Sequence, residues 1–280
     1  MYPKHFFERF WEAEQKNELF VCMSFHNNCD DRFEKIFKPA AKGIGLDAVR
    51  VKEDIKPNEI KSKILDGIAN SKLILIDLSN DPKSSFDGIS HVNGNVLYEA
   101  GISHAMREPE AIVMIREEKI DDNIDFDING MTINSPPYNK FTKEWLTNLL
   151  KKTLDSYEWY KSKRVKAIAE SIDDVCLRFM IQVGRRPNGY NHFNTLSMNN
   201  LLEKQSILRL LDLDILKFET GRERSPEEHA YHWTSFGHEV MKYLGIPQFT
   251  LEEFKKERPE EYITIKKANN EWAENQKKKT

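Results

Sequence analysis

The chain contains Leu73-Ile74-Leu75-Ile76-Asp77-Leu78, an apolar run with polar residues on both sides. The run is too short for a helix and is typical of a strand that is buried on both faces of a parallel sheet. Residues 19–23, 47–51 and 111–115 predict further strands, and the segments between them have the apolar spacing of helices. This alternation predicts an α/β domain with a Rossmann-like or flavodoxin-like parallel sheet and right-handed crossovers.

A candidate active site follows the run. Residues 79–94 are polar and interrupted by proline and glycine, which predicts a long loop, and Asn95 is the expected N-cap of a helix carrying Glu99. Ligands of open α/β sheets bind outside the carboxyl ends of the strands, so we expect Asp77 and Glu99 to point into one crevice. The helix dipole should keep Glu99 ionised, as a nucleophile or a stabiliser of an oxocarbenium ion requires.

Further side chains are expected at the same edge of the sheet. The candidate substrate contacts are Ser24, Phe25, His26, Asn93, Asn95 and Tyr98. Each has a plainer interpretation, because a loop after a strand is often polar without a ligand and a tyrosine often packs in a core. Arg50, at the end of the second strand, could reach a phosphate or a carboxylate, or form an exposed ion pair with Glu53 or Asp54.

Two motifs resemble a known family. Asp77 at a strand end and Tyr98-Glu99-Ala100-Gly101 at a helix start are similar to the motifs of nucleoside 2-deoxyribosyltransferases and related nucleotide N-glycosidases. Similar segments occur in TIR-like effectors of bacterial antiviral defence, including retron-associated effectors that join such a domain to a winged helix. The resemblance covers about residues 18–155. It departs from the family at Asn93-Gly94-Asn95, where a Ser or Gly-Thr is common, and at residues 23–28, which replace a glycine-rich loop.

The resemblance implies an enzyme that cleaves an N-glycosidic bond, by hydrolysis or transfer, in a nucleoside, a nucleotide or NAD. It implies that Glu99 is the carboxylate at ribose C1′ and that Asp77 lies on the side of the base. It also implies that the protein works in an oligomer or a larger complex and that a partner holds it inactive. The alternative is a nucleotide-sensing domain without turnover, coupled to a second domain that binds DNA or protein.

The rest of the chain predicts a smaller domain. We expect the α/β domain over residues 1–160, a polar connector at 161–166 within a mostly helical domain over 161–255, and a charged tail at 256–280. Within the second domain, residues 168–183, 199–213 and 234–244 predict helices. Residues 215–219 and 230–233 predict a hairpin.

This order of helices, hairpin and helix resembles a winged helix, with residues 219–229 as the wing. Arg222 and Arg224 at its tip suit contact with the phosphates of DNA or RNA. The alternative is a module that docks a protein partner and carries ordinary solvated arginines.

Composition sets further limits. The 280 residues are 39% hydrophobic and 31% charged with a net charge of −3, which indicates a globular chain without the basic footprint of a dedicated nucleic-acid binder. No apolar segment predicts a signal peptide or a membrane span, so we expect a cytoplasmic protein that does not act at a membrane. Three cysteines without ligand spacing predict reduced thiols, and we expect no metal and no other cofactor.

Overall fold

The computed structural model describes residues 15–25, 27–51, 57–86, 89–117, 132–188, 190–191, 201–218 and 231–277. His26 and the wing with Arg222 and Arg224 lie outside these residues. The chain divides into two compact units, Met1–Lys161 and Ser162–Thr280.

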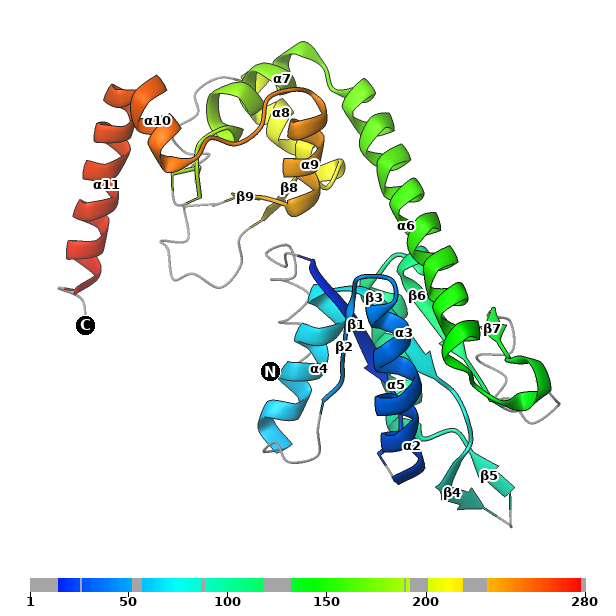
Figure 1. Ribbon diagram of the computed structural model, residues 1–280. Coiled ribbons are helices and arrows are strands. Elements are labelled where there is room, and N and C mark those ends of the chain that lie inside the picture. The colour runs from blue at the N-terminus through cyan, green and yellow to red at the C-terminus, as the bar shows by residue number, and fades with distance from the viewer. Residues whose placement is uncertain are drawn as a thin grey trace. The chain divides into compact units, whose positions relative to one another are not determined.

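The first unit is built on a parallel sheet, as the apolar runs predicted (Figure 1). Its strands are β1 (Lys16–Cys22), β2 (Asp47–Val49), β3 (Ser71–Asp77), β6 (Ile112–Ile115) and β7 (Ile133–Asn134). Their order is β2-β1-β3-β6-β7, and every neighbouring pair is parallel. This α/β architecture is compatible with a Rossmann-like domain, whose ligands bind at the carboxyl ends of the strands.

Helices cover both faces of the sheet. They are α2 (Asn27–Arg32), a π-helical segment (Phe33–Phe37), α3 (Lys38–Lys42), α4 (Pro57–Asn70), α5 (Gly94–Met106) and α6 (Lys143–Ser171). Successive strand residues point to opposite faces. Leu73 and Leu75 therefore share a core with the run from α2 to α3 and with α6, whereas Ile74 and Ile76 share a core with α4 and α5.

The segment after β3 is not the long loop that we expected. It forms the antiparallel hairpin of β4 (Asp81–Phe86) and β5 (Ile89–His91), and short 3-10 turns occur elsewhere at Pro109–Ala111 and Pro137–Asn139. The N-cap of α5 is Asn93 rather than Asn95, since the Asn93 side chain accepts a hydrogen bond from the backbone N–H of Asn95. The helix therefore begins earlier than predicted, and Glu99 lies in its second turn.

The boundary between the units falls inside a helix. The predicted connector at 161–166 is helical, because these residues continue α6. The same helix supplies Tyr157 to the core of the first unit and Val165 to the core of the second. The helix predicted over 168–183 is likewise interrupted: α6 ends at Ser171, and Asp173 caps a new helix by accepting a hydrogen bond from Cys176 N.

The second unit is mostly helical. Its elements are α7 (Asp174–Phe179), a π-helical segment (Met180–Gly184), α8 (Leu201–Asp212), β8 (Leu216–Phe218), β9 (Tyr231–Trp233), α9 (Ser235–Tyr243), α10 (Leu251–Glu257) and α11 (Pro259–Lys277). Strands β8 and β9 pair in antiparallel fashion, which confirms the predicted hairpin. Thr234 caps α9 through a hydrogen bond that its hydroxyl accepts from Gly237 N.

Helix α10 and the beginning of the predicted charged tail at 256–280 contact the rest of this unit. Phe254 is fully buried. Arg258 donates hydrogen bonds to the carbonyls of Ile181 and Gln182, and Arg186 pairs with Glu261. Among the described residues, no helix is long and apolar enough to cross a membrane.

Candidate functional site

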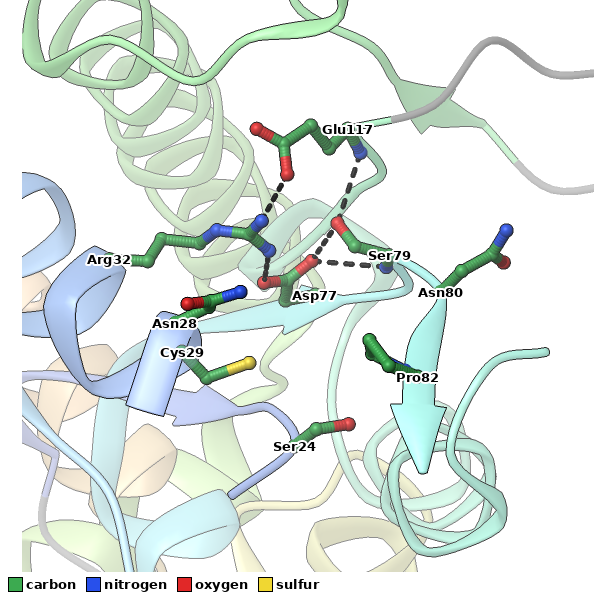
Figure 2. A pocket seen from close by; sticks show the side chains of 9 residues that line it. All are labelled: Ser24, Asn28, Cys29, Arg32, Asp77, Ser79, Asn80, Pro82 and Glu117. Atoms are coloured by element: carbon green, nitrogen blue, oxygen red, sulfur yellow. Dashed lines mark hydrogen bonds and ion pairs between the residues drawn. The ribbon is translucent and has the colours of Figure 1, made fainter. Parts of the chain in front are cut away.

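A cavity of about 200 Å³ opens at the carboxyl ends of β1, β3 and β6 (Figure 2). Its lining residues are Ser24, Asn28, Cys29, Arg32, Asp77, Ser79, Asn80, Pro82 and Glu117. They come from the segments that follow these three strands, from α2 and from the end of β3 itself. The cavity therefore lies where the sheet architecture predicts a ligand site, and it contains two of the expected residues, Ser24 and Asp77.

Both oxygens of the buried Asp77 carboxylate accept hydrogen bonds. Oδ2 accepts from Arg32 Nη1 at 2.7 Å, and Oδ1 accepts from the backbone N–H of Ser79 at 3.1 Å and from its hydroxyl at 2.5 Å. The Ser79 hydroxyl also accepts from Glu117 N at 3.0 Å. These bonds tie the ends of β3 and β6 together and fix the orientation of Asp77.

Arg32 lies between two carboxylates, as Figure 2 shows. Burial disfavours its charge, but Asp77 and then Glu117 outweigh that effect, so the pKa of the Arg32 guanidinium is raised. The guanidinium also lies 4.7 Å from the centroid of the Phe141 ring. With one cation and two carboxylates, the cavity lining has a formal charge of −1, which disfavours an anion in the cavity itself.

Cys29 lines the cavity but is not a nucleophile at neutral pH. Burial, and then the negative charge of Asp77, raises the pKa of its thiol to about 11. The reactive form of a cysteine is the thiolate, which is scarce this far below the pKa.

Glu99 has the more unusual environment. Burial raises the pKa of its carboxyl to about 7, although a hydrogen bond from the Cys22 thiol opposes the shift. The helix dipole, which we expected to keep this group ionised, therefore does not offset the effect of burial. The dipole contributes about 0.3–1 kcal/mol, whereas a shift from 4.5 to 7 corresponds to about 3 kcal/mol, so burial dominates.

Cys22 is the last residue of β1 and is fully buried beneath α5. Burial, followed by the charge of Glu99, raises the pKa of its thiol well above the ordinary value. The protonated thiol is therefore a hydrogen-bond donor to Glu99. The Ser103 hydroxyl donates to the backbone carbonyl of Glu99 at 2.8 Å and fixes the helix at this point.

Asp77 and Glu99 belong to opposite faces of the sheet. Asp77 has the same parity as Leu73 and Leu75 and contacts α2 through Arg32, whereas Glu99 contacts Cys22, whose face packs against α4 and α5. Glu99 is not among the residues that line the cavity. Both carboxyl groups lie at the carboxyl edge of the sheet, Asp77 in the lining of this cavity and Glu99 outside that lining.

The remaining predicted contacts have different surroundings. Asn93 donates to Asp81 Oδ2 at 2.8 Å and so links α5 to the β4–β5 hairpin. Asn95 is exposed, and Tyr98 is 58% exposed, which rules out a core role for its ring. Phe25 follows Ser24 and lies 5.7 Å, ring centroid to Cζ, from the guanidinium of Arg50.

Sequence reasoning missed Arg32, Glu117 and Cys22. Arg32 and Cys22 could have been found from the alternation of side chains along the strands. Every second strand residue faces the helix that follows β1, and the residues between them face the helices that follow β2 and β3. Among the described residues, no group of three or more His, Cys, Asp or Glu side chains is placed to hold a metal ion.

Two comparisons with known proteins found no match. No family model matches the chain, and no curated protein matches it. The resemblance to nucleoside deoxyribosyltransferases therefore depends on Asp77 and on the short motif around Glu99.

Proposed function

We propose that the first unit cleaves the N-glycosidic bond of a nucleoside, a nucleotide or NAD, by hydrolysis or by transfer of the sugar. The observation that carries the proposal is the Glu99 carboxyl, which lies at the carboxyl edge of a parallel sheet and has a pKa raised to about 7. A carboxyl group with this pKa exists in both protonation states near neutral pH. Perturbed carboxyl groups at such an edge are characteristic of active sites.

The reaction follows from the carboxylate form. An oxygen of Glu99 forms a bond to C1′ as the bond between C1′ and the base nitrogen breaks, and the base leaves with the electron pair. A purine or pyrimidine then takes up a proton, whereas the cationic nicotinamide of NAD leaves as the neutral molecule. Water then attacks C1′, loses a proton and releases Glu99 and the free sugar. A second base in place of water gives transfer. Because attack requires the carboxylate, the rate should rise with pH through about 7.

Asp77 supports the site by orientation. Its hydrogen bonds hold Arg32 and Ser79, whose polar groups line the cavity that we assign to the leaving base. This role differs from direct protonation of the base, because both Asp77 oxygens are already occupied by donors. It predicts that Asp77→Asn lowers turnover less than Glu99→Gln does.

The experiment is a chromatographic screen for release of free base or nicotinamide. Purified full-length protein is incubated with nucleosides, nucleotides and NAD, and Glu99→Gln is compared with Glu34→Gln. Glu34 is an exposed carboxylate paired with Lys38, so its loss should leave activity unchanged. Release by the wild type that persists in Glu99→Gln would contradict the proposal.

A nucleotide-sensing domain without turnover is the second candidate. The occupied oxygens of Asp77 favour it, because a carboxylate already engaged by Arg32 and Ser79 has little capacity left for a substrate. The two functions differ in one measurement. Tight binding of a nucleotide that is recovered intact after long incubation supports the sensor, whereas recovery of free base supports the enzyme.

The second unit supplies the biological context of the proposal. We assign to it a winged-helix role, with Arg222 and Arg224 contacting DNA or RNA or with a protein partner in their place. Support comes from the β8–β9 hairpin followed by α9.

By its resemblance to retron-associated toxins, the chain would act in the cytoplasm as an antiviral effector, oligomeric or within a complex whose partner holds it inactive. Arg222→Ala combined with Arg224→Ala should weaken nucleic-acid binding and reduce its salt dependence.

A further inference from the structure

Arg50 is a largely buried cation next to the edge strand β2. It directly follows the last residue of β2, and its guanidinium lies 4.5 Å from the centroid of the Phe33 ring and 5.7 Å from that of Phe25. One nitrogen, Nη2, donates to Asp30 on α2. The Arg50 side chain is only 10% exposed, so it is held in place by aromatic packing as well as by the ion pair.

Two donors of Arg50 have no acceptor within the described part of the chain. Nε and Nη1 are buried, and neither has a hydrogen-bond partner among the described residues. Buried donors without partners are costly and rare in folded proteins, so a guanidinium in this state indicates a missing acceptor. Glu53 and Asp54, the partners that the sequence offered, lie outside the described residues.

Arg107 is a buried arginine with a structural role, and its hydrogen bonds can be compared with those of Arg50. It is also buried, and it donates to the backbone carbonyls of Ile68, Ser71 and Lys72, where α4 ends and β3 begins. Its donors are directed at oxygens that the fold itself supplies. The buried guanidinium of Arg50, in contrast, still has hydrogen-bond donors that no described residue accepts.

The partner of Arg50 is exchangeable. The Asp30 side chain is 55% exposed, and an ion pair with an exposed member contributes little to stability. A phosphate carries more negative charge and more acceptor oxygens than a carboxylate. It can therefore replace Asp30 at the guanidinium when that exposed side chain turns to solvent.

Arg50 also lies close to the cavity. Phe25, whose ring contacts Arg50, directly follows Ser24, which lines the cavity. Cys29 also lines the cavity, and the charges of both Asp77 and Arg50 affect the pKa of its thiol. The cavity has a formal charge of −1 from Arg32, Asp77 and Glu117 and is unsuited to an anion. A ligand with a neutral or cationic part in the cavity and a phosphate outside it would match this distribution of charge.

We propose that Arg50 binds the phosphate of the substrate in place of Asp30, so that the preferred substrate is a nucleotide rather than a free nucleoside. The inference rests on the proposed function for the identity of the ligand. It does not depend on turnover, because phosphate recognition can be measured by binding alone.

The test is calorimetric titration of the full-length protein with the common ribonucleosides and deoxyribonucleosides, each paired with its 5′-monophosphate. At least one monophosphate should bind more tightly than its nucleoside. Arg50→Gln should weaken binding of that monophosphate about tenfold or more and leave the nucleoside unchanged. Arg50→Lys should recover part of the loss, because it restores the charge without the planar donors.

A second variant tests the same site from the other side. Asp30→Asn should tighten binding of the monophosphate several-fold, because it removes the competing carboxylate. The neighbouring Asp31→Asn and Lys35→Gln are matched controls, since this pair is exposed on the same helical run and should leave affinity unchanged. Should Arg50→Gln not fold, Asp30→Asn with its controls still decides the question.

Two outcomes separate this inference from the proposed function. Base release that is equal for nucleoside and nucleotide and unchanged in Arg50→Gln would overturn the phosphate site and leave the enzyme standing. Phosphate-dependent binding that Arg50→Gln abolishes, without base release under any condition, would support the site and contradict the enzyme. Equal affinity of the wild type for every nucleoside and its monophosphate would overturn the site directly.

Discussion

Arg32 Nη1 donates to Asp77 Oδ2 at 2.7 Å, and Nη2 of the same guanidinium donates to Glu117. One cation from α2 thus pairs with two carboxylates, one at the end of β3 and one that follows β6. The contact explains how segments that are distant in sequence form one wall of the cavity. It also makes Asp77 depend on Arg32, because the Asp77 carboxylate is almost fully buried.

Arg32→Ala should therefore destabilise the protein by about 3 kcal/mol, because it leaves the buried Asp77 charge without its cation. Chemical denaturation measures the change. Asp77→Asn introduced into Arg32→Ala should restore part of the stability, and Lys35→Ala, which breaks an exposed pair on the same helical run, should cost less than about 0.5 kcal/mol. Equal losses in Arg32→Ala and Lys35→Ala would show that the contact contributes nothing specific.

The pKa of Glu99 predicts a pH dependence of stability. The folded-state pKa of about 7 lies above the ordinary value of 4.5, so the folded state holds this proton more tightly than the unfolded state does. The stabilisation is complete below about pH 4.5 and is lost as the pH rises through about 7. Glu99→Gln cannot ionise and should gain about 2–3 kcal/mol relative to the wild type between pH 5 and pH 8.

Urea denaturation of both proteins at several pH values tests this, because the other titrating groups cancel in the difference. A difference that stays constant from pH 5 to pH 8 would mean that Glu99 is solvated. It would also remove the main support for its role in the site.

The sheet could be predicted from sequence because its strands are short apolar runs bounded by polar residues, as in residues 73–78. The β4–β5 hairpin could not, because Asp81–Phe86 contains Pro82 and two serines and lacks the alternation of a half-buried strand. Residues 256–280 were predicted as a charged tail because they carry no apolar period, and the anchor just before them, Phe254, leaves no periodic signal on its own.

That anchor gives a prediction for the second unit. Phe254→Ala should cost about 3 kcal/mol or more, because the ring is fully buried and packs edge-on against Tyr190 and Tyr262. Tyr243→Ala is the control, since that ring is 53% exposed. A loss for Phe254→Ala no larger than for Tyr243→Ala would contradict the role of this ring as an anchor of α10 and α11.

The candidate site was predicted in part. Asp77 and Ser24 could be placed at the cavity because strand ends were recognisable, and the carboxyl ends of parallel strands form one edge. That Asp77 and Glu99 belong to opposite faces of the sheet was not predicted, because it depends on the register of the strand, and a shift of one residue reverses the face. Burial of Glu99 could not be predicted either, since it depends on how closely α5 packs over Cys22.

Close packing also makes Gly67 on α4 a sensitive position. A Cβ atom there would overlap the ring of Phe20 on β1, so Gly67→Ala should destabilise by about 1–3 kcal/mol. Gly101 on α5 has open space around the same position, and Gly101→Ala should stabilise by about 0.5–1 kcal/mol through helix propensity. Thermal denaturation should therefore shift in opposite directions for the two variants, and a gain in Gly67→Ala would contradict the packing of α4 on the sheet.

The central claim is that Glu99 acts on the glycosidic carbon, and the most direct measurement is base release by Glu99→Gln under conditions in which the wild type is active. The variant keeps the size of the side chain but removes the carboxylate, so turnover should fall by at least about a thousandfold while the nucleotide still binds. Binding is checked by calorimetry on the same preparations. Normal turnover by Glu99→Gln would contradict the account and would leave Glu99 as a buried carboxyl without a catalytic role.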